Sequence, residues 1–292
     1  MKTITSVAAL REELLNEWEH SIGLVPTMGS LHAGHFSLIK EAKKNNDIVV
    51  VSIFVNPLQF GPDEDYDTYP RAFMMDEQYA EELGVDIVFA PTVQEMYPRT
   101  MYNKVHVEKG TQALCGKSRP GHFDGVSTVV LKLFNIVEPK RAYFGLKDAQ
   151  QVAVIENMVI DFNLPVEIAA CETVREKDGL AVSSRNSNLT RQERGQAVYL
   201  HDCLQEVKKS VEAGERDTAI LEEEMRAFLH SNTDGVVDYC EILTFPELKH
   251  QSLLSGKIII AAALQFSKVR LIDNVIVHVK GEKSYVSNND EI

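Results

Sequence analysis

The sequence predicts an α/β protein, with a Rossmann-like parallel sheet domain followed by a smaller C-terminal α+β domain. Apolar strand-like runs alternate with amphipathic helical stretches at least four times before Arg185, which is the pattern of a parallel sheet with crossover helices. One of these runs, residues 48–55, is apolar almost throughout, as is typical of a strand covered on both faces. The alternation stops after Arg185, so we place the two domains at residues 1–185 and 186–292.

The expected elements begin with a helix at residues 7–19, in which Leu10, Leu14 and Trp18 recur at helical spacing. The first domain continues with strands at 22–25, 48–55, 85–90, 104–108, 141–145 and 166–174, helices at 76–83, 126–137 and 146–162, and a glycine-rich loop at 116–125. In the second domain, Thr190 and Glu193 predict a capping box for a helix that runs to residue 212. A helix at 218–230 and strands at 237–243, 258–263 and 269–279 follow, and residues 288–292 are expected to fray.

Composition and charge narrow the class of protein. The chain has 292 residues, 44% of them hydrophobic, which is enough to bury the cores of two domains. A formal net charge of −13 disfavours nucleic acid or an anionic membrane as the main partner, because both need a positive footprint. The sequence shows neither an apolar run of transmembrane length nor a secretory signal core, so we expect a cytoplasmic protein. Cys115, Cys171, Cys203 and Cys240 are too widely spaced to suggest a disulfide framework or a cysteine zinc site.

Residues 23–40 run from an apolar strand, through a glycine-containing turn, into an amphipathic helix. Open α/β sheets bind ligands at the carboxyl ends of their strands, which is where this turn falls. The start of a helix also offers unpaired backbone N–H groups and a positive dipole end, and both suit a phosphate. Gly29 and Gly34 would let such a ligand approach the backbone. His32 and His35 lie in the first helical turn and are candidates to contact it.

Other interpretations of this histidine pair stay open at this point. Two histidines three residues apart can be ordinary surface or core residues. They can also bind zinc, although zinc sites use a pair four residues apart or add cysteines at fixed spacing. The position of His32 and His35 between a strand and a helix favours phosphate binding.

Two later segments place a positively charged residue in a turn or loop, where it could also contact a phosphate. Lys147 follows the expected strand 141–145, and Asp148 is placed to cap the next helix. Ser183, Ser184 and Arg185 form a hydroxyl-rich, basic stretch at the expected domain boundary. The glycine-rich loop 116–125, which contains Arg119, is a candidate flap over a site. Gln150 is expected on a helix surface rather than in the site.

Several motifs, taken together and in this order, closely resemble the pantothenate synthetase family over essentially the whole chain. They are Pro-Thr-Met-Gly at 26–29, His-Ala-Gly-His at 32–35, Asn-Pro-Leu-Gln-Phe at 56–60, Tyr-Pro-Arg at 69–71, Arg-Pro-Gly-His-Phe-Asp-Gly-Val at 119–126, Phe-Gly-Leu-Lys-Asp-Ala-Gln-Gln at 144–151 and Ser-Ser-Arg-Asn at 183–186. The family is similar in fold to class I aminoacyl-tRNA synthetases and nucleotidyltransferases. The resemblance implies ATP-dependent condensation of (R)-pantoate with β-alanine, through a pantoyl adenylate, in the route to pantothenate and coenzyme A.

The resemblance also implies roles for individual residues. His35, His32 and Lys147 are the expected catalytic residues, with His35 as a proton donor to the phosphate chain. Gln59 and Gln151 are expected to hold the substrates pantoate and β-alanine, pantoate above all, because an amide both donates and accepts hydrogen bonds. Asp76 is the expected contact of Mg²⁺. The expected ATP-binding residues are Met28, Gly29, Ser30, Leu31, His32, Ala33, Gly34, His35, Gly145, Leu146, Lys147, Asp148, Val174, Val182, Ser183, Ser184 and Arg185.

On this interpretation, residues 1–185 bind nucleotide and pantoate, and residues 186–292 form a lid that closes over the site. The family implies a homodimer whose other partners are small molecules, with no nucleic acid and no membrane. Leu146 stands where relatives carry Glu or Gln, and Val182 where they carry Met, and both changes are expected to tune packing. Two alternatives remain: a nucleotidyltransferase of the same superfamily that acts on a phosphorylated acceptor, and a nucleotide sensor without catalysis.

Overall fold

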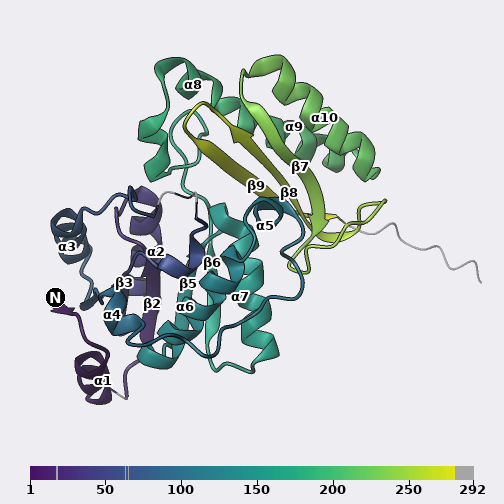
Figure 1. The fold of residues 1–292 in the computed structure, drawn as a ribbon. Helices are drawn as coiled ribbons and strands as arrows, with labels where there is room; N and C mark the ends of the chain where they lie inside the picture. The colour runs from purple at the N-terminus through teal and green to yellow at the C-terminus, as the bar shows by residue number, and fades with distance from the viewer. Residues whose placement is uncertain (18, 63, 65, 280–292) are drawn as a thin grey trace, which may run out of the picture.

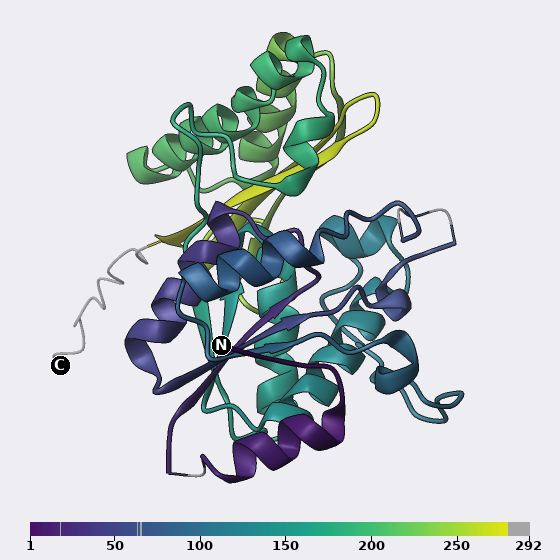
Figure 2. The same ribbon diagram turned by 90° about the vertical axis from the view of Figure 1, so that its left-hand side faces the viewer.

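The computed structural model describes residues 1–279 except Trp18, Asp63 and Asp65 (Figures 1 and 2). Its first part is a six-stranded sheet with the spatial order β1-β4-β3-β2-β5-β6, in which every neighbouring pair is parallel. The strands are β1 (Lys2–Ile4), β2 (Ile22–Thr27), β3 (Ile48–Ile53), β4 (Ile87–Phe89), β5 (Arg141–Gly145) and β6 (Glu167–Cys171). The chain passes from β2 to β3 on one side and later returns to place β5 on the other side of β2. Strand order therefore reverses between β2 and β5, and such a switch point is where open α/β sheets bind ligands.

Helices cover both faces of this sheet. The helices of this unit are α1 (Val7–Leu15), α2 (Ala33–Asn45), α3 (Phe73–Glu82), α4 (Val93–Met96), α5 (Leu114–Ser118), α6 (His122–Val137) and α7 (Ala149–Asp161), of which α5 packs toward the C-terminal unit. Val50 joins the core formed with α1, α6 and α7, while its neighbours Val49 and Val51 join the core formed with α2 and α3. This alternation explains why β3 is apolar except for Ser52, because each side chain meets a covered face.

The C-terminal unit contains a three-stranded antiparallel sheet, β7 (Val236–Thr244), β8 (Gly256–Gln265) and β9 (Arg270–Val279). The helices α8 (Arg191–Gln196), α9 (Val198–Ala213) and α10 (Thr218–Asn232) precede it. One face of the small sheet packs with α9 and α10 around a buried core. Leu180, which lies before the expected boundary at Arg185, belongs to this second core.

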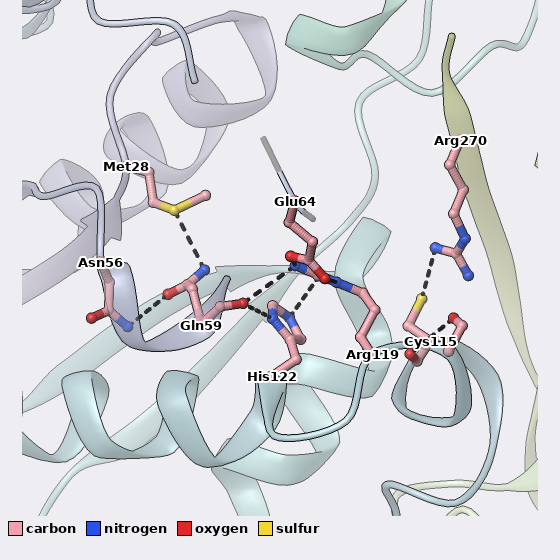
Figure 3. Close-up of polar contacts among 9 residues, drawn as sticks. Met28, Asn56, Gln59, Glu64, Cys115, Arg119, His122 and Arg270 are labelled. Atoms are coloured by element: carbon pink, nitrogen blue, oxygen red, sulfur yellow. Dashed lines mark hydrogen bonds and ion pairs between the residues drawn. The ribbon is translucent and has the colours of Figure 1, made fainter. Parts of the chain in front are cut away.

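The other face of the small sheet packs against the parallel-sheet unit, above α5 and α7 in Figure 1. Leu243 and Ile259 from the sheet share one buried cluster with Ala153 from α7 and Phe123 from α6. At the edge of this contact, Arg270 Nη1 donates to Cys115 Sγ over 3.4 Å (Figure 3). The two units therefore share a buried apolar contact.

The structure confirms most of the expected elements and corrects some. The expected strand 104–108 is absent, because Val105 N donates to the Thr128 hydroxyl and Val107 N to Asp124 instead of to a neighbouring strand. The expected loop 116–125 is largely helical, since α5 ends at Ser118 and α6 begins at His122. The predicted capping box of Thr190 and Glu193 is present, but the helix that it opens ends at Gln196 and α9 starts separately.

Further expectations have clear outcomes. The structure adds β1, which the sequence interpretation missed. Cys115, Cys171, Cys203 and Cys240 are free thiols, as expected. Within the described residues, no helix is both long enough and apolar enough to span a bilayer. The expected fraying at 288–292 lies outside the described residues.

Candidate active site

The turn between β2 and α2 is shaped by two residues in the left-handed region. Gly29 has φ of +84° and Ser30 has φ of 55°, so the chain reverses sharply after Met28. Asp76, at the start of α3, closes this turn because its two carboxylate oxygens accept from Ser30 N (2.8 Å) and Leu31 N (2.7 Å). Asp76 is only 2% exposed. Each oxygen of this buried carboxylate already accepts one backbone N–H, so Asp76 stabilises the turn, and its expected contact with magnesium stays a prediction.

His32 and His35 cap α2 with their own side chains. His32 is the N-cap residue and its Nδ1 accepts from Gly34 N (3.1 Å), while His35 Nδ1 accepts from His32 N (3.3 Å). A backbone N–H can only donate, so Nδ1 of each ring carries no proton and the neutral ring holds its proton on Nε2. The ring centroids are 4.1 Å apart. The pair therefore presents two neighbouring Nε2–H donors.

Both imidazoles are neutral near pH 7. Burial lowers the pKa of His35 to about 3, and the neighbouring His32 acts in the same direction. Burial also lowers the pKa of His32, and the positive charge of Lys147 adds to this effect. In this state the two rings act as hydrogen-bond donors rather than as cations, and the fixed positive charge nearby comes from Lys147.

The turn between β5 and α7 is a short 3-10 helix, η2 (Leu146–Asp148). Lys147 Nζ lies 3.7 Å from Asp148 Oδ1. Asp148 is the N-cap residue of α7 but its side chain makes no capping hydrogen bond, so that part of the expectation is wrong. Instead, Asn274 on β9 donates its side-chain amide to Leu146 O (2.8 Å) and Lys147 O (3.1 Å).

Three hollows meet at this second turn. We call them the histidine cavity (about 130 Å³), the glutamine cavity (about 220 Å³) and the interdomain cleft (about 720 Å³). Lys147, Asp148 and Gln151 line all three. The histidine cavity also has His32, Gly34, His35, Gly145, Val174 and Val182 on its wall, and the glutamine cavity has Met28, His32, His35, Gln59, Ser183, Ser184 and Arg185. Most of the predicted site residues are thus brought together.

Gln59 lies in η1 (Pro57–Gln59), directly after β3, and its amide orientation is fixed (Figure 3). Asn56 accepts at Oδ1 from Leu58 N and from the Tyr97 hydroxyl (2.7 Å), and it donates from Nδ2 to Gly125 O. Leu58 N can only donate and Gly125 O can only accept, so these two partners identify the oxygen and the nitrogen of the Asn56 amide. Asn56 Nδ2 also donates to Gln59 Oε1 (3.1 Å), which leaves Gln59 Nε2 directed toward Met28 Sδ (3.4 Å). Gln59 therefore offers a donor to the glutamine cavity.

Arg119 and His122 line the glutamine cavity next to Gln59. His122 Nδ1 donates to Gln59 O (2.7 Å), because a carbonyl only accepts, and Arg119 Nη1 donates to His122 Nε2 (2.9 Å). Burial lowers the pKa of His122 to about 4, and the Arg119 charge adds to the effect, so this ring is also neutral. Glu64 pairs with the Arg119 guanidinium through both carboxylate oxygens (Figure 3). Close packing of α6 on η1 depends on Gly125, where a Cβ would lie 2.2 Å from Leu58 O.

Some of the predicted ATP-binding residues are not among the described residues that line the three hollows. Leu31 is buried, Leu146 packs into the apolar cores, and Gly29 lies against Asp76. Together with Ser30 and Ala33 they are absent from the described linings of the three hollows. Their expected contacts with ATP remain predictions. Gln150 is another correction: it is buried, not on the helix surface, and its amide donates to Gly110 O and Ala113 O.

Four residues of the site escaped the sequence interpretation. Asn56 and Tyr97 orient Gln59, His122 supports its backbone, and Asn274 holds the Lys147 segment. Asn56 and His122 lie inside the motifs at 56–60 and 119–126, which gave a signal for them. Tyr97 and Asn274 lie outside every motif. Among the described residues there is no group of three or more His, Cys, Asp or Glu side chains that could hold a metal ion.

A parallel sheet with two neutral histidines and a lysine at its switch point defines a nucleotide-binding α/β protein that handles phosphate groups. The comparisons with known proteins make this specific. A sequence profile described as Pantoate-beta-alanine ligase matches residues 2–276. The chain belongs to the pantoate-beta-alanine ligase family and is a ligase of that family.

Similar proteins cover nearly the whole chain. A pantothenate synthetase from Halalkalibacterium halodurans is 54% identical over 95% of this chain and 99% of its own length, and one from Bacillus cereus is 52% identical over 96% and 100%. The solved structure of pantothenate synthetase from Thermus thermophilus matches with a TM-score of 0.89 at 42% identity, covering 96% of this chain and 100% of that one. The pantoate-beta-alanine ligase from Francisella tularensis, solved with beta-gamma ATP and beta-alanine, matches with a TM-score of 0.77 at 36% identity over 94% and 97%.

Proposed function

We propose that the chain catalyses the ATP-dependent condensation of (R)-pantoate with β-alanine, through a pantoyl adenylate, to give pantothenate, AMP and pyrophosphate. One observation carries the proposal: the histidine cavity, the glutamine cavity and the interdomain cleft meet at Lys147, Asp148 and Gln151. A reaction of three small substrates needs three adjoining spaces around one reacting centre. The Francisella tularensis relative, solved with an ATP compound and beta-alanine, supports this assignment.

In the first step, a pantoate carboxylate oxygen attacks the α-phosphorus of ATP. The new O–P bond forms as the bond from the α-phosphorus to the bridging oxygen breaks, and pyrophosphate leaves. Gln59 presents a donor and Gln151 an amide to pantoate, whose hydroxyls and carboxylate can accept. Lys147 and the Nε2–H groups of His32 and His35 stabilise the charge that builds on the phosphate chain.

The neutral state of the His35 ring changes the role that we assign to it. A ring whose pKa is lowered to about 3 carries no readily lost proton at neutral pH. We therefore assign His35 as a preorganised hydrogen-bond donor to the phosphate chain, in place of a proton donor. The hydrogen bond from the neutral Nε2–H strengthens as negative charge develops on the phosphate oxygens that accept it.

In the second step, the amine of β-alanine attacks the carbonyl carbon of the adenylate. The new C–N bond forms, the bond from the carbonyl carbon to the AMP oxygen breaks so that AMP leaves, and the nitrogen loses a proton to solvent. Because ATP and pantoate occupy the two smaller cavities, β-alanine enters through the interdomain cleft. Arg185 and Ser183, which line both the cleft and the glutamine cavity, stay close to the phosphate during this step.

The remaining assignments rest on the family. We propose a cytoplasmic homodimer that acts in coenzyme A biosynthesis, with Mg²⁺ held mainly by ATP phosphates and water, since magnesium often uses only one or two protein carboxylates. Residues 186–292 are proposed to close over the site. Closure predicts that hydrogen exchange in residues 183–186 becomes slower when ATP and pantoate are added. Unchanged exchange would count against closure.

The test of the function is pyrophosphate release. Pyrophosphate should appear only when ATP and pantoate are both present, and AMP and pantothenate only after β-alanine is added. Release that ignores pantoate, or adenylyl transfer that prefers a phosphorylated acceptor, would overturn the proposal and favour a nucleotidyltransferase. ATP binding with no turnover of any acceptor would favour a sensor.

A further inference from the structure

Asn274 connects the C-terminal unit to the backbone that carries Lys147. It lies on β9, is 8% exposed, and donates both amide hydrogens, one to Leu146 O (2.8 Å) and one to Lys147 O (3.1 Å). Both partners are carbonyls and can only accept, so the amide nitrogen must face them. One side chain thus fixes two successive peptide groups of η2.

The residue before Asn274 holds this part of β9 in place. Asp273 is 3% exposed, and its Oδ1 accepts from Asn274 N (2.8 Å) and from Arg175 Nη2 (3.0 Å). Its Oδ2 accepts from Arg175 Nη1 (2.6 Å), and the same guanidinium donates to Gly179 O. Asn274 therefore donates from a rigid support, which is what a positioning contact needs.

The Lys147 segment is fixed on one side by Leu146, which packs into the apolar cores, but its own polar side chains add no cap. The N-cap residue of α7 makes no side-chain capping bond, and η2 is a single 3-10 turn. Lys147 carries its charge at the end of a long flexible stem, so a small rotation of its peptide group moves Nζ appreciably. A displacement of about 1 Å in a catalytic group can reduce a rate by about 10²-fold.

We propose that Asn274 is a positioning residue for adenylate formation: it sets the peptide groups around Lys147 so that Nζ reaches the phosphate chain. This inference rests on the proposed function, which gives Lys147 its role. It assigns the C-terminal unit a part in the first chemical step, in addition to covering the cleft.

The first experiment replaces Asn274 with Ala and measures pyrophosphate release at saturating ATP and pantoate. The expected result is a fall in kcat of about 30-fold with KM for pantoate changed by less than about threefold, because binding groups stay in place while the lysine does not. The matched control is Asn232→Ala, which removes an amide that donates to Phe228 O within the same unit and should leave kcat unchanged. If Asn274→Ala fails to fold, Asn274→Ser keeps one short donor and is measured in its place.

The second experiment separates positioning from general loss of structure. Asn274→Ala is measured again in a Lys147→Ala background, using labelled ATP to follow the slow residual reaction. If Asn274 acts through Lys147, the substitution has little further effect there, less than about threefold. An equal loss in both backgrounds, or an unchanged kcat in the single variant, would overturn the proposal.

The third measurement does not depend on activity. Without ATP, Asn274→Ala should speed hydrogen exchange in peptides that cover residues 146–151 and leave those covering α2 unchanged. If the unmodified protein releases no pyrophosphate with ATP and pantoate, the proposed function fails. Exchange alone then decides whether Asn274 fixes this segment, and unchanged exchange at 146–151 would reject that.

Discussion

The β2–α2 and β5–α7 turns lie on either side of the switch point, but they are held in different ways. The first is closed largely by its own side chains, since His32 and His35 cap α2, with Asp76 accepting from the turn. The second has no capping side chain of its own and is held by Asn274, 127 residues from Lys147 in sequence. The comparison shows that one half of the proposed phosphate site is specified mainly by nearby residues, while the other half depends on a distant unit.

The largest effect is expected from His35, which both caps α2 and faces the histidine cavity. His35→Ala should lower the rate of adenylate formation by about 10²- to 10³-fold, because a preorganised donor to the developing charge is lost. ATP affinity, measured by calorimetry, should fall far less. Pyrophosphate release at the unmodified rate would refute the assigned role.

The control for this variant is His35→Gln. Glutamine at the third helical position accepts from the N-cap backbone in an ordinary capping box, so it retains the cap and removes the imidazole donor. A large rate loss with an unchanged melting temperature in His35→Gln would show that the cap and the phosphate contact are separable. Full activity in His35→Gln would mean that the loss of the cap alone explains the effect of His35→Ala.

The next effect contrasts the two acidic residues near the turns. Asp76→Ala leaves two buried N–H groups without acceptors and should lower the free energy of unfolding by about 3 kcal/mol. Asp148→Ala should change it by less than about 0.5 kcal/mol, because the Asp148 side chain makes no capping bond. Urea unfolding of both variants measures the difference. If Asp148→Ala destabilises the protein as much as Asp76→Ala, the contrast between the turns is wrong.

This contrast also explains what the sequence could predict. The strands and helices of the parallel sheet show in the periodicity of the sequence, and the His32–His35 turn depends on contacts between near neighbours. Gln59, Lys147 and Gln151 were reached through motif resemblance and do line one cavity system. Whether each one binds the expected substrate stays a prediction.

The missed features share a physical cause, which is contact between segments far apart in the chain. Packing of α3 places Asp76 beneath Ser30, 46 residues away in sequence, and no pattern in the sequence indicates that contact. Tyr97 reaches Asn56 across 41 residues, and no periodicity records that pairing. The strand expected at 104–108 had suitable residues but no neighbouring strand to pair with, so side-chain acceptors on α6 took its N–H groups.

A smaller effect is expected at Gly34, where an added Cβ would lie 2.9 Å from His32 Cε1 and 3.1 Å from its Nδ1. Gly34→Ala should move the His32 ring and raise KM for ATP about tenfold, while the helix gains up to about 1 kcal/mol from the better helix former. The control is Gly195→Ala in α8, where the added Cβ meets nothing within 4 Å. An unchanged KM for ATP in Gly34→Ala would show that the His32 ring does not need this space.

The smallest effect concerns pH and tests whether the first turn holds neutral histidines. Burial lowers the pKa of folded His35 from 6.5 to about 3, so between these values the unfolded chain binds more protons than the folded one. Stability is therefore fully present above about pH 6.5 and falls as the pH drops toward 3. His35→Gln removes this contribution, so the free energy of unfolding of the unmodified protein should fall by about 1 kcal/mol more than that of the variant between about pH 7 and 5.5. Parallel pH dependence in the two proteins would mean that His35 titrates normally when folded, and that the turn does not preorganise a neutral donor.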